Sequence, residues 1–215
     1  YNVQGGRYRK LLISFGPPTV RLQLIIHYED GTSQTVASDK TWKYDFSPVT
    51  FNCIYGGEDY DARQEQKGWN MAKFNDTLLK QVVVQEGPKG VLRPQIAAPV
   101  AIMEHYSPIS ATHLPDSLLA AASKSTKRKV DASAIVLDMG QNLAGFPEIT
   151  VKGKKGQTVT LLVAEALTPE GACNQRQTGR QHYYQYTLKG DGEETWHPRL
   201  LWISIHPNRG RYDAR

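Results

Sequence analysis

The sequence predicts an all-β protein built from antiparallel β-sandwiches. Segment 20–28 alternates apolar and polar residues over its first half, as a half-buried strand does. An Asp-Gly turn within Glu29-Asp-Gly-Thr32 then gives a strong hairpin signal before the returning segment 35–38. Helical periodicity is weak in the first half, and Gly and Pro turns separate the short β-rich segments. This pattern favours antiparallel sheets over a helical or an α/β fold.

The composition limits the classes of protein to which this chain can belong. The 215 residues, with 40% hydrophobic and 22% charged residues, suit one large or two small globular domains without a disorder signature. No apolar run approaches the roughly 20 residues that span a bilayer, so we expect no membrane insertion. The net charge of +5 comes largely from a lysine-rich run at 124–129 and from the tail 199–215. Since no nucleic-acid-binding module is present, we expect no nucleic-acid partner.

The middle of the chain differs in amino-acid composition from the segments around it. Residues 107–133 contain Pro108, Pro115, an alanine-rich step and the basic run Lys127–Lys129, which together predict a linker with a solvated basic loop. Cys53 and Cys173 match no metal-ligand spacing, and they are either two free thiols or a disulfide.

One motif stands out as a candidate site, the stretch Asn52-Cys-Ile-Tyr-Gly-Gly-Glu-Asp-Tyr-Asp-Ala-Arg63. Its paired glycines permit positive φ or close backbone approach. Three carboxylates follow at once, at Glu58, Asp59 and Asp61. Arg63 lies on the same side as Asp61 if the segment is extended. We expect these carboxylates to accept hydrogen bonds from turn amides or to pair with Arg63.

This motif resembles the Ile-Tyr-(Asp or Gly)-Gly-Glu-x-Tyr-Asp-Ala-Arg signature of bacterial α-L-rhamnosidases, glycoside hydrolase family 78. Residues 134–146 are similar to the same family's Phe-Asp-(Phe or Met)-Gly-Gln-Asn-x-Ala-Gly motif. Residues 164–171 are similar to its Ala-Glu-x-Leu-x-x-Asp-Gly motif. The resemblance covers residues 1–199 through several independent motifs.

The resemblance implies two jelly-roll-like β-sandwich domains. Residues 1–106 would form a partial N-terminal sandwich, incomplete at its N-terminus because the family domain starts well before Tyr1. Residues 107–133 would be the linker, 134–199 a second, partial sandwich, and 200–215 an aberrant tail. The opening Tyr1–Gly6 has neither an initiating Met nor a signal-like hydrophobic segment, which is typical of the middle of a longer protein.

The resemblance also implies a function. The family hydrolyses terminal α-L-rhamnose from glycosides with inversion, using acidic residues of an (α/α)6 barrel. That barrel would lie beyond this chain, so we expect an accessory, non-catalytic part of such an enzyme, with no catalytic residue of its own. Its partners would be rhamnose-containing glycans and the missing barrel domain. The family suggests a periplasmic or extracellular location.

Two alternatives remain open at this point. Some relatives carry a calcium-dependent rhamnose-binding sandwich, so the chain could be a stand-alone carbohydrate-binding module, with Tyr55, Glu58 and Asp61 as carbohydrate or calcium ligands. A purely structural sandwich would need neither sugar nor metal. The aromatic segment 183–186 could be a sugar-stacking platform or part of the core.

The tail after Arg199 departs from the family, which continues with an aromatic run and Gly-Phe-Arg-Tyr. Leu200 to Arg209 can be encoded by CTT CTA TGG ATT TCG ATA CAT CCA AAT CGA. Reading from one nucleotide later gives Phe-Tyr-Gly-Phe-Arg-Tyr-Ile-Gln-Ile, the expected continuation. We therefore predict a frameshift after Arg199, and sequencing of the genomic DNA tests it. A locus in which no reading frame encodes Gly-Phe-Arg-Tyr would contradict this prediction.

Overall fold

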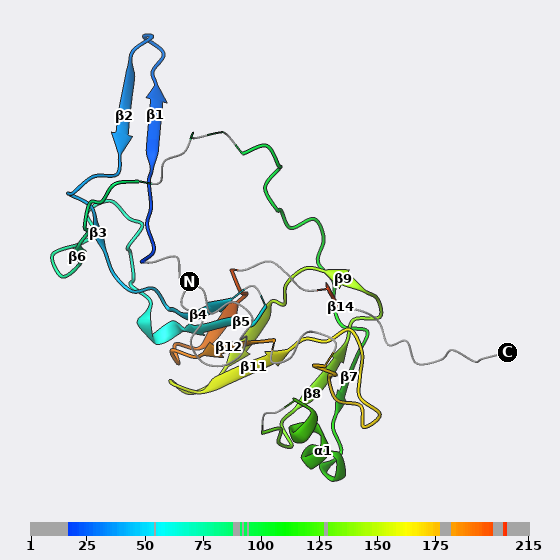
Figure 1. The fold of residues 1–215 in the computed structure, drawn as a ribbon. Coiled ribbons are helices and arrows are strands. Elements are labelled where there is room, and N and C mark those ends of the chain that lie inside the picture. Colours follow the sequence, from blue (N-terminus) through cyan, green and yellow to red (C-terminus); the bar gives the residue numbers. More distant parts are fainter. Residues whose placement is uncertain are drawn as a thin grey trace. The chain divides into compact units, whose positions relative to one another are not determined.

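A computed structural model describes residues 17–53, 55–87, 91, 93, 95–126, 129–176, 182–199 and 204–205 (Figure 1). Strands dominate these residues, and helix is limited to α1 (Asp116–Thr126) and the short 3-10 helix η1 (Ala62–Gln64). The predicted all-β class is confirmed. Within the part described, α1 has 11 residues, too few to cross a membrane. The chain divides into two compact units, whose described residues are 17–47 with 66–98, and 48–65 with 99–205.

The first unit consists of a hairpin and a short two-stranded ladder. Antiparallel pairing joins β1 (Gln23–His27) to β2 (Ser33–Ala37), and β3 (Lys43–Tyr44) to β6 (Lys80–Gln81). At the hairpin turn the Asp30 carboxylate accepts hydrogen bonds from the backbone N–H and the hydroxyl of Thr32. The predicted Asp-Gly hairpin is therefore confirmed.

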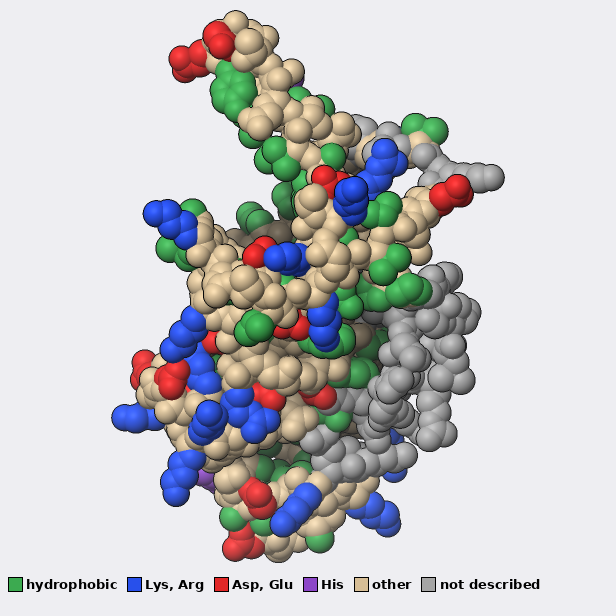
Figure 2. Space-filling model, turned by 90° about the vertical axis from the view of Figure 1, so that its left-hand side faces the viewer, with side chains coloured by type: hydrophobic (Ala, Val, Ile, Leu, Met, Phe, Trp, Pro, Cys, Tyr) green, Lys and Arg blue, Asp and Glu red, His purple; other side chains and the backbone are tan. Residues whose placement is uncertain are grey.

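Hydrophobic side chains lie at the surface of this hairpin, at the top of Figure 2. Leu24 is 52% exposed, Ile25 51% and Val36 40%. Because Leu24 and Ile25 are consecutive, they point to opposite sides of the strand, so both faces of the hairpin carry exposed apolar surface.

The second unit is organised by a four-stranded sheet in the order β11-β12-β5-β4. Its strands come from distant parts of the chain (Figure 1): β4 (Val49–Cys53), β5 (Gly57–Asp61), β11 (Thr158–Leu162) and β12 (Tyr183–Thr187). The β4–β5 and β11–β12 ladders are antiparallel, whereas β12 and β5 pair in parallel, with Tyr184 beside Glu58. Two neighbouring strands that run parallel need a long connection, and here the whole chain between β5 and β12 forms it.

A second layer packs on one face of this sheet. It is the antiparallel pair of β10 (Ile149–Lys152) and β13 (Glu193–Trp196). The core between the layers is aromatic: Tyr186 stacks on Tyr60 with ring centroids 5.8 Å apart, and Trp196 lies 5.2 Å from Tyr186. Tyr184 and Tyr186 are 1% and 2% exposed. Of the two interpretations of segment 183–186, core packing therefore holds for these two tyrosines.

The segment 107–133, where the sequence predicts a linker, contains regular structure. It contains β7 (Ser110–His113), which pairs with β8 (Ile135–Asp138), and the helix α1. Leu114, Ala122 and Ala172 form a small apolar cluster with this helix. The alanine-rich step is a strong helix former, and the Ser123 hydroxyl accepts a hydrogen bond from the backbone N–H of Val130, which fastens the following segment to the helix.

The compact units also differ from the expected boundaries at 1–106 and 134–199. Because β5 pairs with β12, residues 48–65 lie in one unit with the second half of the chain. The expected loss of opening strands before Tyr1 concerns a segment outside the described residues. The aberrant tail 200–215 also lies outside them except for β14 (Ser204–Ile205), which pairs with β9 (Leu143–Ala144).

Gly57 permits the close approach of β5 to β12. Its φ is +90°, and a Cβ atom there would lie 1.9 Å from the carbonyl oxygen of Tyr183. We predict that Gly57→Ala lowers the free energy of unfolding by about 3 kcal/mol or more, since backbone atoms must move apart. Urea unfolding measures this.

Gly192→Ala is the matched control. Gly192 also has a left-handed φ, +103°, but a Cβ atom there would have open space. Gly192→Ala should lower the free energy of unfolding by about 1 kcal/mol, the cost of backbone strain. Equal effects of the two substitutions would contradict the steric role of Gly57.

Candidate functional site

The candidate site is the signature stretch, which forms the end of β4, a turn, β5 and η1. The structure places the three predicted ligands in different surroundings. Tyr55 lies in the turn and is 48% exposed, Glu58 is fully buried, and Asp61 is half-buried at the end of β5. These differences decide what each side chain can bind.

Glu58 is a structural tie between three segments. Its carboxylate accepts a hydrogen bond from the Asn52 side-chain amide at 3.1 Å, and the backbone N–H of Arg199 donates to its two oxygens at 3.3 and 3.2 Å. These bonds join β4, β5 and the segment after β13. Burial, with a smaller contribution from the charge of Glu58, raises the pKa of the neighbouring Tyr184 above its ordinary range. A buried carboxylate is tolerated when donors surround it.

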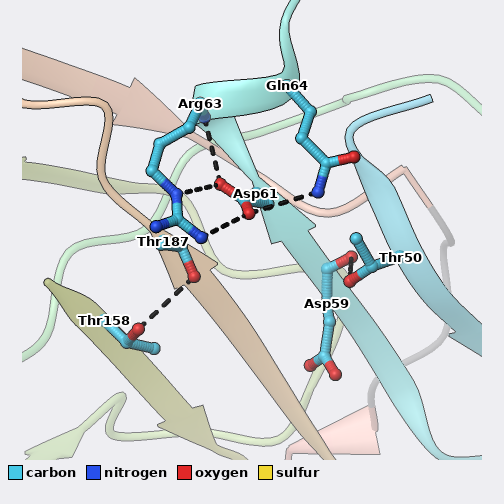
Figure 3. Close-up of polar contacts among 7 residues, drawn as sticks. All are labelled: Thr50, Asp59, Asp61, Arg63, Gln64, Thr158 and Thr187. Carbon is cyan, nitrogen blue, oxygen red and sulfur yellow. Dashed lines mark hydrogen bonds and ion pairs between the residues drawn. The ribbon is translucent and has the colours of Figure 1, made fainter. Parts of the chain in front are cut away.

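Asp61 is the acceptor in a compact polar cluster (Figure 3). The Arg63 guanidinium binds both carboxylate oxygens, at 2.8 Å from Nε and 2.7 Å from Nη2, and the Gln64 amide donates at 3.2 Å. The backbone N–H of Arg63 also donates to Asp61, at 3.1 Å, which caps η1. The hydrogen bonds from Arg63 hold the pKa of Asp61 at about 2. The expected pairing of Asp61 with Arg63 is therefore confirmed.

The structure does not bring the three predicted ligands together. Glu58 and Asp61 are three residues apart on one strand, so they point to opposite faces of the sheet. Glu58 faces the aromatic core, and Figure 3 shows Asp61 engaged with Arg63 and Gln64. Among the described residues, no group of three His, Cys, Asp or Glu side chains could hold a metal ion. Carbohydrate or calcium binding by Tyr55, Glu58 and Asp61 stays a prediction without a shared surface to support it.

A cavity of about 630 Å³ lies beside β13, a feature that the sequence motifs did not indicate. It is lined by aromatic core residues and by polar residues from the end of η1, from the turn after β12, from β13 and from the segment following it: Tyr60, Glu65, Tyr186, Lys189, Glu193, Glu194, Thr195, Trp196, His197 and Arg199. The sequence of β13, Glu-Glu-Thr-Trp, does not alternate between polar and apolar residues, so no local pattern pointed to this cavity.

Two of the three carboxylates that line this cavity, Glu65 and Glu194, already have partners. Glu65 forms an ion pair with Lys189 at 2.7 Å and accepts a hydrogen bond from the Tyr60 hydroxyl at 3.1 Å. Glu194, 4% exposed, accepts from the Tyr186 hydroxyl and from the N–H groups of Gly190 and Lys189. Burial alone would raise the pKa of Glu194, but these hydrogen bonds lower it overall. A general acid needs the opposite shift.

The two cysteines are free thiols, and both are half-buried. Burial raises the pKa of the Cys173 thiol, which suppresses its reactivity. Of the two interpretations of the cysteines, free thiols therefore hold.

Two family models match the chain. The model of the α-L-rhamnosidase N-terminal domain matches residues 1–104, and the model of the bacterial α-L-rhamnosidase concanavalin-like domain matches residues 128–206. An α-L-rhamnosidase of Formosa agariphila is 33% identical over 199 residues, which is 88% of this chain. One of Streptomyces avermitilis is 35% identical over 211 residues, which is 93% of this chain. The chain spans 19% of the length of each of these relatives.

Solved structures agree with these matches. The α-L-rhamnosidase from Dictyoglumus thermophilum superposes with a TM-score of 0.74 at 28% identity, over 86% of this chain and 20% of that one. The Streptomyces avermitilis α-L-rhamnosidase complexed with L-rhamnose gives a TM-score of 0.70 at 30% identity, over 86% of this chain and 16% of that one.

The low pKa of Asp61 predicts a pH dependence of stability. The folded-state pKa of about 2 lies below the ordinary value of 3.8, so the contribution of Asp61 is fully present above about pH 4. It is lost as the pH falls toward 2, because the unfolded chain takes up the proton first. Asp61→Asn should therefore flatten the fall in unfolding free energy between pH 4 and 2, measured by urea denaturation at each pH.

The control is the same carboxylate-to-amide change in the exposed hairpin turn, Glu29→Gln, which should leave that slope nearly as in the parent. An Asp61→Asn slope equal to that of the parent would contradict the Asp61–Arg63 interaction as its source.

Proposed function

Because the chain belongs to the bacterial α-L-rhamnosidase family, we propose that it is an accessory, non-catalytic β-sandwich part of an enzyme that hydrolyses terminal α-L-rhamnose from glycosides. The observation that carries this proposal is the position of the matches. The matching models describe an N-terminal and a concanavalin-like domain of these enzymes, and the chain spans 19% of the length of each of the two relatives. The catalytic (α/α)6 barrel would belong to another part of the enzyme.

The chemistry of the described carboxylates supports a non-catalytic role. Inverting hydrolysis needs two carboxyl groups about 6.5–9.5 Å apart on either side of the sugar, one of them a general acid with a raised pKa. Glu58 and Asp61 lie on opposite faces of β5, and Glu58 is closed off from solvent. Asp61 and Glu194 both have lowered pKa values, because donors stabilise their ionised forms.

Polar contacts between distant segments favour a scaffolding role. Glu58 and the Lys189–Glu65 ion pair each join segments that are more than a hundred residues apart in sequence. A rigid sandwich of this kind could position a neighbouring barrel domain and the rhamnose-containing glycan that it cleaves. In such a scaffold, residues of the signature stretch form hydrogen bonds within the chain.

The alternative is a stand-alone rhamnose-binding module, with or without calcium. It would need Tyr55, Glu58 and Asp61, or another set of polar groups, to converge on one sugar or one cation, and the geometry of β5 separates them. Isothermal titration of the chain with L-rhamnose, with and without calcium, distinguishes this alternative from the accessory role.

We predict that the purified chain alone does not cleave a chromogenic α-L-rhamnoside, since no acid–base pair is preorganised in its described residues. The double variant Glu58→Gln with Asp61→Asn is the control for contaminating enzyme. Turnover by the parent that disappears in this variant would contradict the proposal. Turnover that persists in both would be due to a contaminant.

A further inference from the structure

The two layers of the second unit are unequal within the described residues. Four strands form one sheet, and the layer facing them across the aromatic core has only β10 and β13. Antiparallel pairing with β10 uses one edge of β13. In the part of the chain that the structure describes, no strand pairs with the other edge. Such an edge presents backbone N–H and C=O groups that can pair with another strand.

The cavity beside β13 runs along this edge. Five consecutive residues, 193–197, line it. Consecutive side chains of a strand point to alternate faces, so one cavity can touch all five only along the backbone edge. The facing wall is formed by the Tyr60 and Tyr186 rings and by the Glu65–Lys189 ion pair.

Trp196 gives an independent sign that this edge lacks a partner. Its side chain is 6% exposed and lines the cavity, and its buried indole N–H has no hydrogen-bond acceptor in the described part of the chain. A buried donor without an acceptor destabilises the fold. A strand laid along the edge would bring acceptors to it.

We propose that the free edge of β13 pairs antiparallel with the same edge of a second copy of this chain. An antiparallel pair of identical strands has twofold symmetry, the commonest symmetry of protein dimers. The sequence of the strand selects the register, because opposed residues of an antiparallel pair point to the same face.

A register centred on Glu194 would oppose two buried carboxylates, and one centred on Glu193 would oppose two exposed ones. Centring on Thr195 instead places Glu193 opposite His197 of the second copy, and the symmetry repeats this pair. This register keeps the carboxylates of the two copies apart, whereas like charges placed directly opposite one another destabilise a ladder.

The surroundings of β13 fit this register. Glu193, Thr195 and His197 are exposed, so these side chains would lie on the outer face of the joined sheet. Pro198 follows at once and has no N–H to donate, which ends the ladder after His197. Glu194 and Trp196 point inward, and the second strand would cover the cavity that they line.

Sedimentation velocity of the 215-residue chain over a concentration series tests the proposal. We expect a monomer–dimer equilibrium in the parent. His197→Glu should raise the dimer dissociation constant about tenfold, because it opposes two carboxylates in each of two symmetry-related pairs. Adding Glu193→Lys to this variant places a lysine opposite each new carboxylate and should return the constant to within about threefold of the parent.

The rescue separates a charge effect at this interface from the loss of the contact between the His197 and Phe146 rings, whose centroids are 5.0 Å apart, because the double variant also lacks that contact. Glu29→Lys, in the hairpin turn, is the control for net charge and should leave the constant unchanged. A monomeric parent would overturn the proposal. So would a His197→Glu variant that dimerises like the parent, a double variant that is not rescued, or a Glu29→Lys variant that also shifts the constant.

Discussion

The parallel ladder between β5 and β12 is the constraint on which the rest of the second unit depends. It joins the signature stretch to a strand more than a hundred residues later, with Gly57 beside Tyr183 and Asp61 beside Thr187. A side chain at position 57 would collide with the Tyr183 backbone, so the second glycine of the pair permits the contact. Once β5 is fixed in this way, Tyr60 falls into the aromatic core and Glu58 beside Tyr184.

The surroundings of Glu58 show that apolar and polar interactions contribute differently to the fold. The aromatic rings supply apolar burial, worth about 1.5–3 kcal/mol for each large side chain, but they are adaptable in orientation. The carboxylate adds little net stability, because its desolvation offsets most of its hydrogen bonding. It does require particular donors, the Asn52 amide and the Arg199 N–H, to reach one place. We infer that Glu58 selects one arrangement of three segments.

Local features of this fold could be predicted from the sequence, and long-range ones could not. The Asp-Gly turn and the Asp61–Arg63 pair depend on residues a few positions apart, where turn chemistry and strand geometry decide the outcome. The β5–β12 pairing leaves no local pattern. The acidic character of Glu58 suggested a solvated turn, whereas its surroundings bury it. The helix at 116–126 was missed because prolines and charges around it outweighed its alanines in the sequence pattern.

The sequence motifs identified the family but not the features that could bind a partner. The motifs depend on local sequence, whereas those features depend on long-range packing. Family motifs mark positions where the backbone or a buried polar group allows few substitutes, as at Gly57 and Glu58, and such positions are mostly interior. A binding surface depends on what the fold leaves unpaired. Here that is an edge of β13 with an indole N–H that has no acceptor in the described chain, beside a cavity walled by residues distant in sequence. Local sequence patterns do not encode a missing neighbour, so only the assembled layers reveal it.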